Sequence, residues 1–171
     1  MTEKELITIG RNVPVDFVGH VNGVPAKVDT GADSSAVWAS DVVVDKENVL
    51  SFRLFDAQSP YFTGETIRTK QYKVAMIRTA SGHQQLRFRV SLALNLGGRK
   101  IRALVNLADR SQQEFPVLIG RRTLSGKFLV DVSLSHYPNR EKATTIGLNK
   151  QLIDDPYKFY VDQYKKQKGQ S

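Results

Sequence analysis

The stretch Val24–Ala32, with the sequence VPAKVDTGA, carries the strongest indication of the fold. Its first residues are small and mostly apolar, as in a buried strand, and the acidic Asp29 follows directly. A carboxylate in this position is costly unless it is hydrogen-bonded or needed for chemistry. Thr30 can hold the next loop through its hydroxyl, and Gly31 allows the backbone to turn tightly. Because all three are also ordinary turn residues, this stretch alone leaves a plain turn and a catalytic loop both open.

Outward from this stretch, short β-rich runs continue as far as residue 132. The expected strands are Val13–Val18, Val24–Val28, Ser51–Phe55, Tyr72–Ile77, Leu86–Leu96, Ile101–Leu107, Pro116–Ile119 and Phe128–Val132. Asn22-Gly23 and Gly97-Gly98 are typical turn sequences between neighbouring strands. The sequence therefore predicts an all-β domain over residues 1–132, followed by an extension over residues 133–171.

The run Leu86–Leu96 alternates apolar with polar residues, which predicts one dry face and one wet face. With the preceding run it forms a hairpin that has Ser81-Gly82 near its tip, where glycine supplies the backbone freedom that a lid needs. Arg87 and Arg89 occupy alternate positions and so share one face. Two interpretations stay open: the arginines are solvated surface, or they form a basic rim that attracts acidic chains.

The last third of the chain changes character after the strands. A wholly apolar run that stops at Gly120 predicts a buried strand followed by one short helix near 121–125. Residues 133–151 are polar and are expected to be irregular. Asp155 followed by Pro156 is typical of a helix start, and the tyrosines of the next segment share one helical face. The extension is therefore expected to contain a helix.

The composition excludes several classes of protein. The chain has 171 residues with 25 Lys and Arg against 17 Asp and Glu, a net charge of +8 that favours an acidic partner. It has no Cys, which excludes disulfides, thiolate metal sites and a Cys nucleophile. No stretch reaches the roughly 18 apolar residues of a membrane span, and residues 1–10 hold no secretory signal. We expect a cytoplasmic protein without a membrane partner.

Three features in a fixed order resemble the retroviral-type aspartic proteases, or retropepsins. They are Asp29-Thr30-Gly31 after a strand, the hairpin over residues 72–92, and Leu118-Ile119-Gly120 before a helix. In that family the same order builds an all-β barrel whose hairpin is a mobile flap. The resemblance implies a retropepsin-like acid-protease barrel with one flap hairpin.

A closer resemblance is to a bacterial family labelled as ATP-dependent zinc proteases. The segments that carry it are Ala26–Ala36, Ala80–His83, Leu107–Ser111 and Phe115–Arg121. That family has a retropepsin-like fold and is associated with ATP-grasp ligases that add glutamates to proteins, including a ribosomal protein. The residues do not support its label, because His20, His83 and His136 are far apart in sequence and no Gly-x-x-x-x-Gly-Lys phosphate loop exists. We expect no metal and no cofactor.

Aspartic peptide hydrolysis needs two carboxylates that share one proton, and this sequence offers a single Asp-Thr-Gly. The resemblance therefore implies a homodimer in which Asp29 of each chain is catalytic. The implied site residues are Thr30, Gly31 and Ala32 in the active-site loop, and Ser81, Gly82, His83, Arg87 and Arg89 in the substrate-binding flap. Asp33 and Asp109 have simpler interpretations: Asp33 as a substrate-side or loop residue, and Asp109 as a turn or local ion-pair residue.

The leading hypothesis is an aspartic endopeptidase that acts on peptide or protein substrates, with glutamylated or otherwise acidic tails as candidates. The alternative is a catalytically weak retropepsin-like module that binds acidic peptides. A nucleic-acid partner is disfavoured because the positive charges are scattered, and aromatic and basic residues interleave only near residues 157–166.

Overall fold

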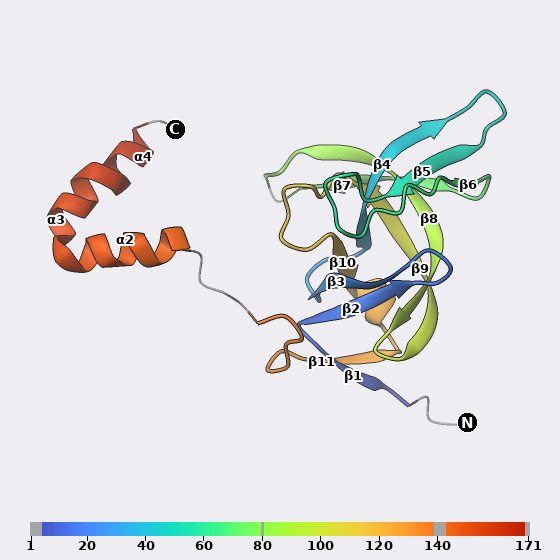
Figure 1. The fold of residues 1–171 in the computed structure, drawn as a ribbon, viewed down its shortest axis with the longest axis horizontal. Helices are drawn as coiled ribbons and strands as arrows, with labels where there is room; N and C mark the ends of the chain where they lie inside the picture. The colour runs from blue at the N-terminus through green and yellow to red at the C-terminus, as the bar shows by residue number, and fades with distance from the viewer. Residues whose placement is uncertain (1–4, 80, 139–142, 170–171) are drawn as a thin grey trace. The chain divides into compact units, whose positions relative to one another are not determined.

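Strands make up most of the first part of the chain (Figure 1). The computed structural model describes residues 5–79, 81–138 and 143–169, so Ala80 of the hairpin tip lies outside the described residues. The chain divides into two compact units, residues 1–137 and 138–171, and each is described by itself.

The first unit contains the following elements in chain order. They are β1 (Ile7–Gly10), β2 (Asn12–Phe17), β3 (Val21–Asp29), β4 (Ser35–Val44), β5 (Leu50–Leu54), β6 (Ile67–Thr69), β7 (Lys73–Arg78), β8 (Gln84–Leu96), β9 (Arg99–Ala108), β10 (Val117–Gly120), α1 (Arg121–Leu124) and β11 (Phe128–Asp131). The bounds of most expected strands agree with these to within a few residues.

Strand β10 closes the barrel because it pairs with two other strands. It runs parallel to β3, with Gly120 opposite Asp29, and antiparallel to β4, with Val117 opposite Val37. The order around the barrel is therefore β10-β3-β2-β8-β9-β4 and back to β10. Strands β5 and β6 continue the sheet beyond β4, β7 pairs with β8, and β1 pairs in parallel with β11. The expected all-β barrel with a hairpin and a short helix is confirmed.

Alternating residues of the barrel strands fill its interior, as the period of a strand requires. Large side chains that are fully buried include Phe17, Phe52 and Phe55. Phe55 meets Phe17 and Trp38 edge to face, with ring centroids 6.0 and 6.3 Å apart, a geometry that favours aromatic pairs. Trp38, the sole tryptophan of the chain, is buried as well. This core fixes the strands whose ends carry the candidate site.

The turn predicted at Asn22-Gly23 is wrong. Both residues lie within β3, and the chain reverses earlier, at residues 18–20. Gly19 takes a φ of 84°, the left-handed conformation that glycine adopts without strain, and the His20 N–H closes the turn on the Phe17 carbonyl at 2.9 Å. Gly23 instead donates its N–H to the Asp16 carboxylate at 2.8 Å, across the irregular end of the β2–β3 ladder.

Three strands have no counterpart in the sequence predictions: β1, β4 and β6. Strand β1 pairs with β11, more than 100 residues away, so nothing local in the sequence marks it. Strand β4 is interrupted by a register shift between Ser40 and Val43, where Asp41 takes a φ of 51°. The shift breaks the period-2 pattern from which a strand is predicted.

The second unit is helical over its described residues. It contains α2 (Ala143–Asp154), α3 (Pro156–Phe159), a π-helical segment (Tyr160–Lys165) and α4 (Lys166–Lys168). The irregular conformation expected for residues 133–151 is wrong over α2, where weak helix formers such as Thr144, Thr145 and Gly147 hide the pattern. The helix start at Asp155 is as expected, because its side chain accepts the Lys158 N–H at 3.0 Å.

Candidate active site

Asp29 is the last residue of β3 and lies beside Gly120, the last residue of β10. Its carboxylate oxygen Oδ1 accepts the backbone N–H groups of Gly31 and Ala32, at 3.0 and 3.1 Å. Oδ2 accepts no hydrogen bond from the described residues. The loop therefore holds the half-buried carboxylate in one orientation and leaves one oxygen for a reacting group.

Hydrogen bonds from the start of α1 hold the loop after Asp29. The Arg121 N–H donates to the Ala32 carbonyl at 2.8 Å, and the Arg122 N–H donates to the Asp33 carbonyl at 3.2 Å. These are N–H groups that a helix start cannot satisfy internally. The Arg121 guanidinium adds a bond to the Gly31 carbonyl at 3.3 Å. The apolar-apolar-Gly strand and the Asp-Thr-Gly loop thus form one structure.

Gly120 is required here by space rather than by its dihedral angles. Its φ is −89°, which any residue can adopt. A Cβ at this position would lie 2.6 Å from the carbonyl carbon and oxygen of Ser34 and 2.9 Å from the carbonyl oxygen of Ala32. Only glycine lets β10 pass this close to the loop.

Buried hydroxyls tie the strands together behind the loop, and no local sequence pattern predicts them. Ser35 Oγ accepts the Gly120 N–H at 3.0 Å and lies 2.7 Å from Thr123 Oγ1. Both side chains are buried. They join β4, β10 and α1 at the point where the barrel closes.

Asn106 forms a second link that sequence reasoning missed. It is 2% exposed, accepts a bond from Arg89 Nε at 2.6 Å and donates to Ser34 Oγ at 2.9 Å. A lone Asn within the buried run Val105–Ala108 is the one signal that could have found it. Arg89 is thereby connected to the active-site loop through Asn106 rather than standing free at the cleft.

Asp33 pairs with both arginines of α1. Its carboxylate lies 3.0 Å from Arg121 Nη2 and 2.9 Å from Arg122 Nε. The hydrogen bond from Arg122 and the charges of both arginines hold the pKa of Asp33 below its usual 3.8. This agrees with its interpretation as a loop residue. Asp109 accepts the Ser111 N–H at 2.9 Å, which agrees with a turn residue.

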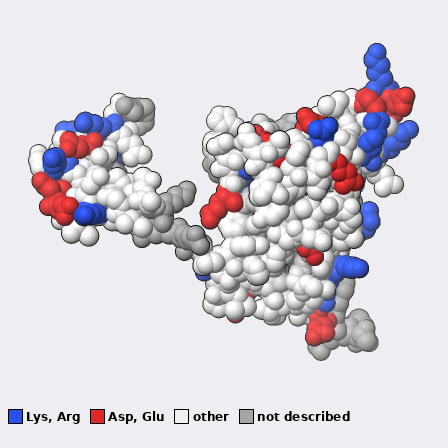
Figure 2. Space-filling view, in the orientation of Figure 1, with Lys and Arg blue, Asp and Glu red and all other residues white. Residues whose placement is uncertain are grey.

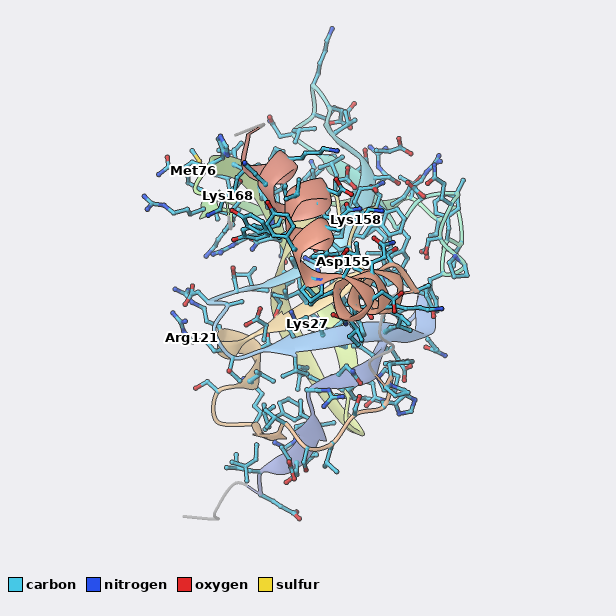
Figure 3. The ribbon with its side chains drawn as sticks, turned by 90° about the vertical axis from the view of Figure 1, so that its left-hand side faces the viewer. Lys27, Met76, Arg121, Asp155, Lys158 and Lys168 are labelled. Atoms are coloured by element: carbon cyan, nitrogen blue, oxygen red, sulfur yellow. The ribbon has the colours of Figure 1, made fainter. Side chains whose placement is uncertain are left out.

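A cavity of about 830 Å³ opens between the active-site loop and the hairpin. Residues that line it include Gly31, Ala32, Asp33, Ser34, Met76, Ile77, Arg78, Ser81, Arg87, Asn106, Asp109, Arg110 and Leu118. Of the residues expected in the site, it brings together Gly31, Ala32, Ser81 and Arg87. Asp29, Thr30, Gly82, His83 and Arg89 do not line it, although Asp29 is joined to the lining residues Gly31 and Ala32 by its hydrogen bonds. Figure 3 shows Met76 of β7 and Arg121 of α1 on the same side of the barrel.

The hairpin β7–β8 departs from the expected pattern of dry and wet faces only near its tip. The predicted dry face holds for Val90, Leu92 and Leu94, which are buried. Closer to the tip it is wrong, because Leu86 is 58% exposed whereas Arg87 is half-buried and lines the cavity. This end of the hairpin extends beyond the barrel, so no core lies under its apolar face.

The hairpin tip is held by local hydrogen bonds. Thr79 donates its N–H to the His83 carbonyl at 2.8 Å, and Gly82 takes a φ of 84°. Ser81 Oγ lies 3.0 Å from His83 Nδ1. The tip therefore has the glycine turn that the sequence predicts, while His83 is exposed.

Comparison with known proteins decides the family. The model of the family described as "Retropepsin-like aspartic endopeptidase RimB" matches residues 13–141, which include the Asp29 loop, the hairpin and β10. The chain belongs to this RimB-like family. A crystal structure of a Legionella pneumophila protein of unknown function has a similar fold, with a TM-score of 0.61 and 21% identity over 77% of this chain and 97% of that one.

Two longer proteins contain a related segment. Each is named a probable alpha-L-glutamate ligase, one from Shewanella pealeana and one from Shewanella halifaxensis. Each is 28% identical to this chain over 118 residues, which are 67% of this chain but only 26% of the relative. The chain thus spans about a quarter of the length of these relatives.

The described residues lack two kinds of feature. Residues 5–79, 81–138 and 143–169 contain no cluster of three or more His, Asp or Glu side chains that could hold a metal ion. No helix among them is long and apolar enough to cross a membrane.

Proposed function

We propose that this protein is an aspartic endopeptidase that acts as a homodimer, in which each chain contributes Asp29 to one shared dyad. The observation that carries the proposal is the Asp29 carboxylate, which is oriented by two N–H groups and keeps one oxygen that accepts no hydrogen bond from the described residues. Gly31 and Ala32 of the same loop line a large cavity. Thr30 is exposed next to it, and its hydroxyl has no partner among the described residues. The exposure of this residue supports the approach of a second chain to the loop.

The chemistry follows from two carboxylates brought together. Two carboxyl groups at close range do not both ionise, because the two negative charges would repel each other. The pair therefore holds one proton between them. The ionised Asp29 takes a proton from a water molecule, whose oxygen attacks the scissile carbonyl carbon. The protonated Asp29 of the partner gives its proton to the carbonyl oxygen. Collapse of the tetrahedral intermediate breaks the C–N bond. The Asp29 that took the proton from water gives it to the leaving nitrogen, and a hydroxyl of the intermediate returns its proton to the partner's Asp29, so the pair again holds one proton.

Acidic protein tails are the substrates that we propose. The cavity contains Arg78, Arg87 and Arg110, whereas of its two acidic residues Asp33 is already paired with α1 and Asp109 accepts the Ser111 N–H. Relatives that contain a similar segment are named glutamate ligases. A peptidase related to a segment of such proteins is well matched to protein tails that carry added glutamates.

A subunit-mixing experiment tests the shared dyad. Asp29→Asn should remove cleavage of a glutamate-rich peptide and leave folding intact, because an amide cannot act as the base. When equal amounts of wild-type and Asp29→Asn chains exchange freely, about a quarter of the dimers carry both carboxylates, and activity should fall to that fraction. Activity that falls only to half would show that each chain acts alone.

Asp131→Asn is a matched control, because Asp131 also ends a strand and accepts an N–H from the residue two positions on. It should cleave normally. A chelator should not reduce the rate; loss of activity that zinc restores would contradict the metal-free mechanism. Sedimentation of the wild-type protein should show a dimer, and a strict monomer with full activity would refute the dyad.

A further inference from the structure

The two partly buried arginines of the cavity, Arg87 and Arg110, have no counter-ion among the described residues, and the third cavity arginine, Arg78, is exposed. Arg87 lies on β8 and Arg110 follows β9, and both line the cavity that borders Gly31 and Ala32. No carboxylate of the described residues lies within ion-pair distance of either one. Other arginines are paired: Arg53 with Asp41, Arg68 with Asp45, and Arg121 and Arg122 with Asp33. Figure 2 shows such paired charges, blue beside red, near the end of the β4–β5 hairpin.

Each of the two guanidinium groups is anchored on one side. Arg87 Nε donates to Gln85 Oε1 at 3.0 Å, and Arg110 Nε donates to the Phe115 carbonyl at 3.1 Å. The Nη groups of both arginines have no hydrogen bond to the described residues. Because the guanidinium is planar, fixing Nε also limits the direction of the Nη donors. Free, oriented donors remain on two neighbouring cations.

The two cations repel each other in a partly dry environment. Burial lowers the pKa of Arg87, and burial together with the charge of Arg87 lowers the pKa of Arg110. The acidic residues of the cavity do not offset this repulsion, since Asp33 is bound to α1 and Asp109 accepts the Ser111 N–H. An anion placed between the arginines would relieve it.

We propose that Arg87 and Arg110 form a carboxylate-binding subsite that selects acidic residues of the substrate. A carboxylate accepts paired N–H bonds from arginine in the geometry that these free Nη groups offer. Met76, Ile77 and Leu118 in the same cavity suit the methylene groups of a glutamate side chain. The carboxylate comes either from a glutamate side chain or from the free end of an acidic tail. This inference rests on the proposed function only in that the bound substrate is then cleaved; binding of the carboxylate itself does not require cleavage.

Binding to an inactive protein tests the subsite apart from the chemistry. The background is Asp29→Asn, and the probe is a fluorescent oligoglutamate peptide measured by anisotropy. Arg87→Gln and Arg110→Gln should each weaken binding roughly 10- to 100-fold, the range for a hydrogen bond to a charged group. The glutamine version of the peptide should bind weakly to every variant. Lys100→Gln is the matched control. It removes one positive charge from an exposed position outside this cavity and should change the affinity little.

Two further arms make the result decisive. Arg110→Lys keeps the charge but loses the Nε bond to Phe115, so it controls for misfolding of Arg110→Gln and should still bind less tightly than arginine. Amidation of the peptide terminus distinguishes the sources: weaker binding assigns the terminal carboxylate, and unchanged binding assigns a side chain. Equal affinity for the glutamate and glutamine peptides, or no loss in either arginine variant, would overturn the subsite.

The same variants separate this inference from the proposed function. In the Asp29-containing protein, loss of the subsite should raise KM for the acidic peptide and leave kcat nearly unchanged. If the wild type cuts no peptide yet the Asp29→Asn protein binds glutamates through both arginines, the endopeptidase proposal fails and the subsite stands. If the Asp29-containing protein cuts acidic and neutral peptides equally, with or without the arginine substitutions, the subsite fails and the endopeptidase proposal stands.

Discussion

Replacing Gly120 by alanine should destabilise the barrel at the point where it closes. The added Cβ would lie 2.6 Å from the Ser34 carbonyl group, whereas ordinary contact begins at 3.4 Å, so backbone must move by about 0.8 Å. Overpacking of this kind costs about 1–3 kcal/mol. For a domain of this size that is a fall of roughly 3–10 °C in Tm.

The displaced backbone belongs to the loop that orients Asp29, so the change should reach the site as well. Amide NMR signals of Gly31 and Ala32, which donate to the Asp29 carboxylate, should shift. Gly147→Ala is the control, because nothing lies within 4 Å of the Cβ it would add and it is in the helical unit. An unchanged Tm and unchanged loop amides in Gly120→Ala would refute the argument that this close approach positions the loop.

Two other predictions concern polar contacts of the same loop. Asn106→Ala should lower the free energy of unfolding by about 1–3 kcal/mol in chemical denaturation, because it leaves Arg89 and Ser34 without their shared partner; an exposed change such as Ser91→Ala should have almost no effect. The lowered pKa of Asp33 means that its pairing with α1 contributes stability above about pH 4, and that this contribution is lost as the pH falls through the lowered value. Asp33→Asn should therefore flatten the fall of Tm between pH 5 and pH 2, and a fall of the same slope would contradict this pairing in solution.

The sequence predicts those parts of the fold that depend on local pattern. The Asp29 loop, the hairpin tip at Gly82 and the β10–α1 junction were all placed correctly, because each rests on a glycine or on an apolar run next to a turn. Strand β1 could not be found in this way, because its ladder comes from β11. Only closure of the barrel brings these distant segments together.

The same distinction between local pattern and tertiary pairing applies to the candidate site. Asp29 is visible in the sequence because a carboxylate directly follows a buried strand. Ser35 and Asn106 are not, since their partners Gly120, Thr123 and Ser34 are set by tertiary pairing. The alternation in β8 correctly predicts two faces, but the sequence does not indicate where the barrel ends and the cavity begins. That boundary decides why Leu86 is exposed and Arg87 is not.

The net charge of +8 also indicates less about substrate preference than the positions of the groups that pair with each arginine. Arg121 and Arg122 are close to the loop, yet both are bound to Asp33, so they stabilise the loop rather than attract a substrate. Arg89 is bound to Asn106. Arg87 and Arg110 are the cavity arginines that combine partial burial with the absence of any acidic partner among the described residues. A preference for acidic substrates, if it arises within the cavity, must therefore depend on these two side chains far more than on the total charge.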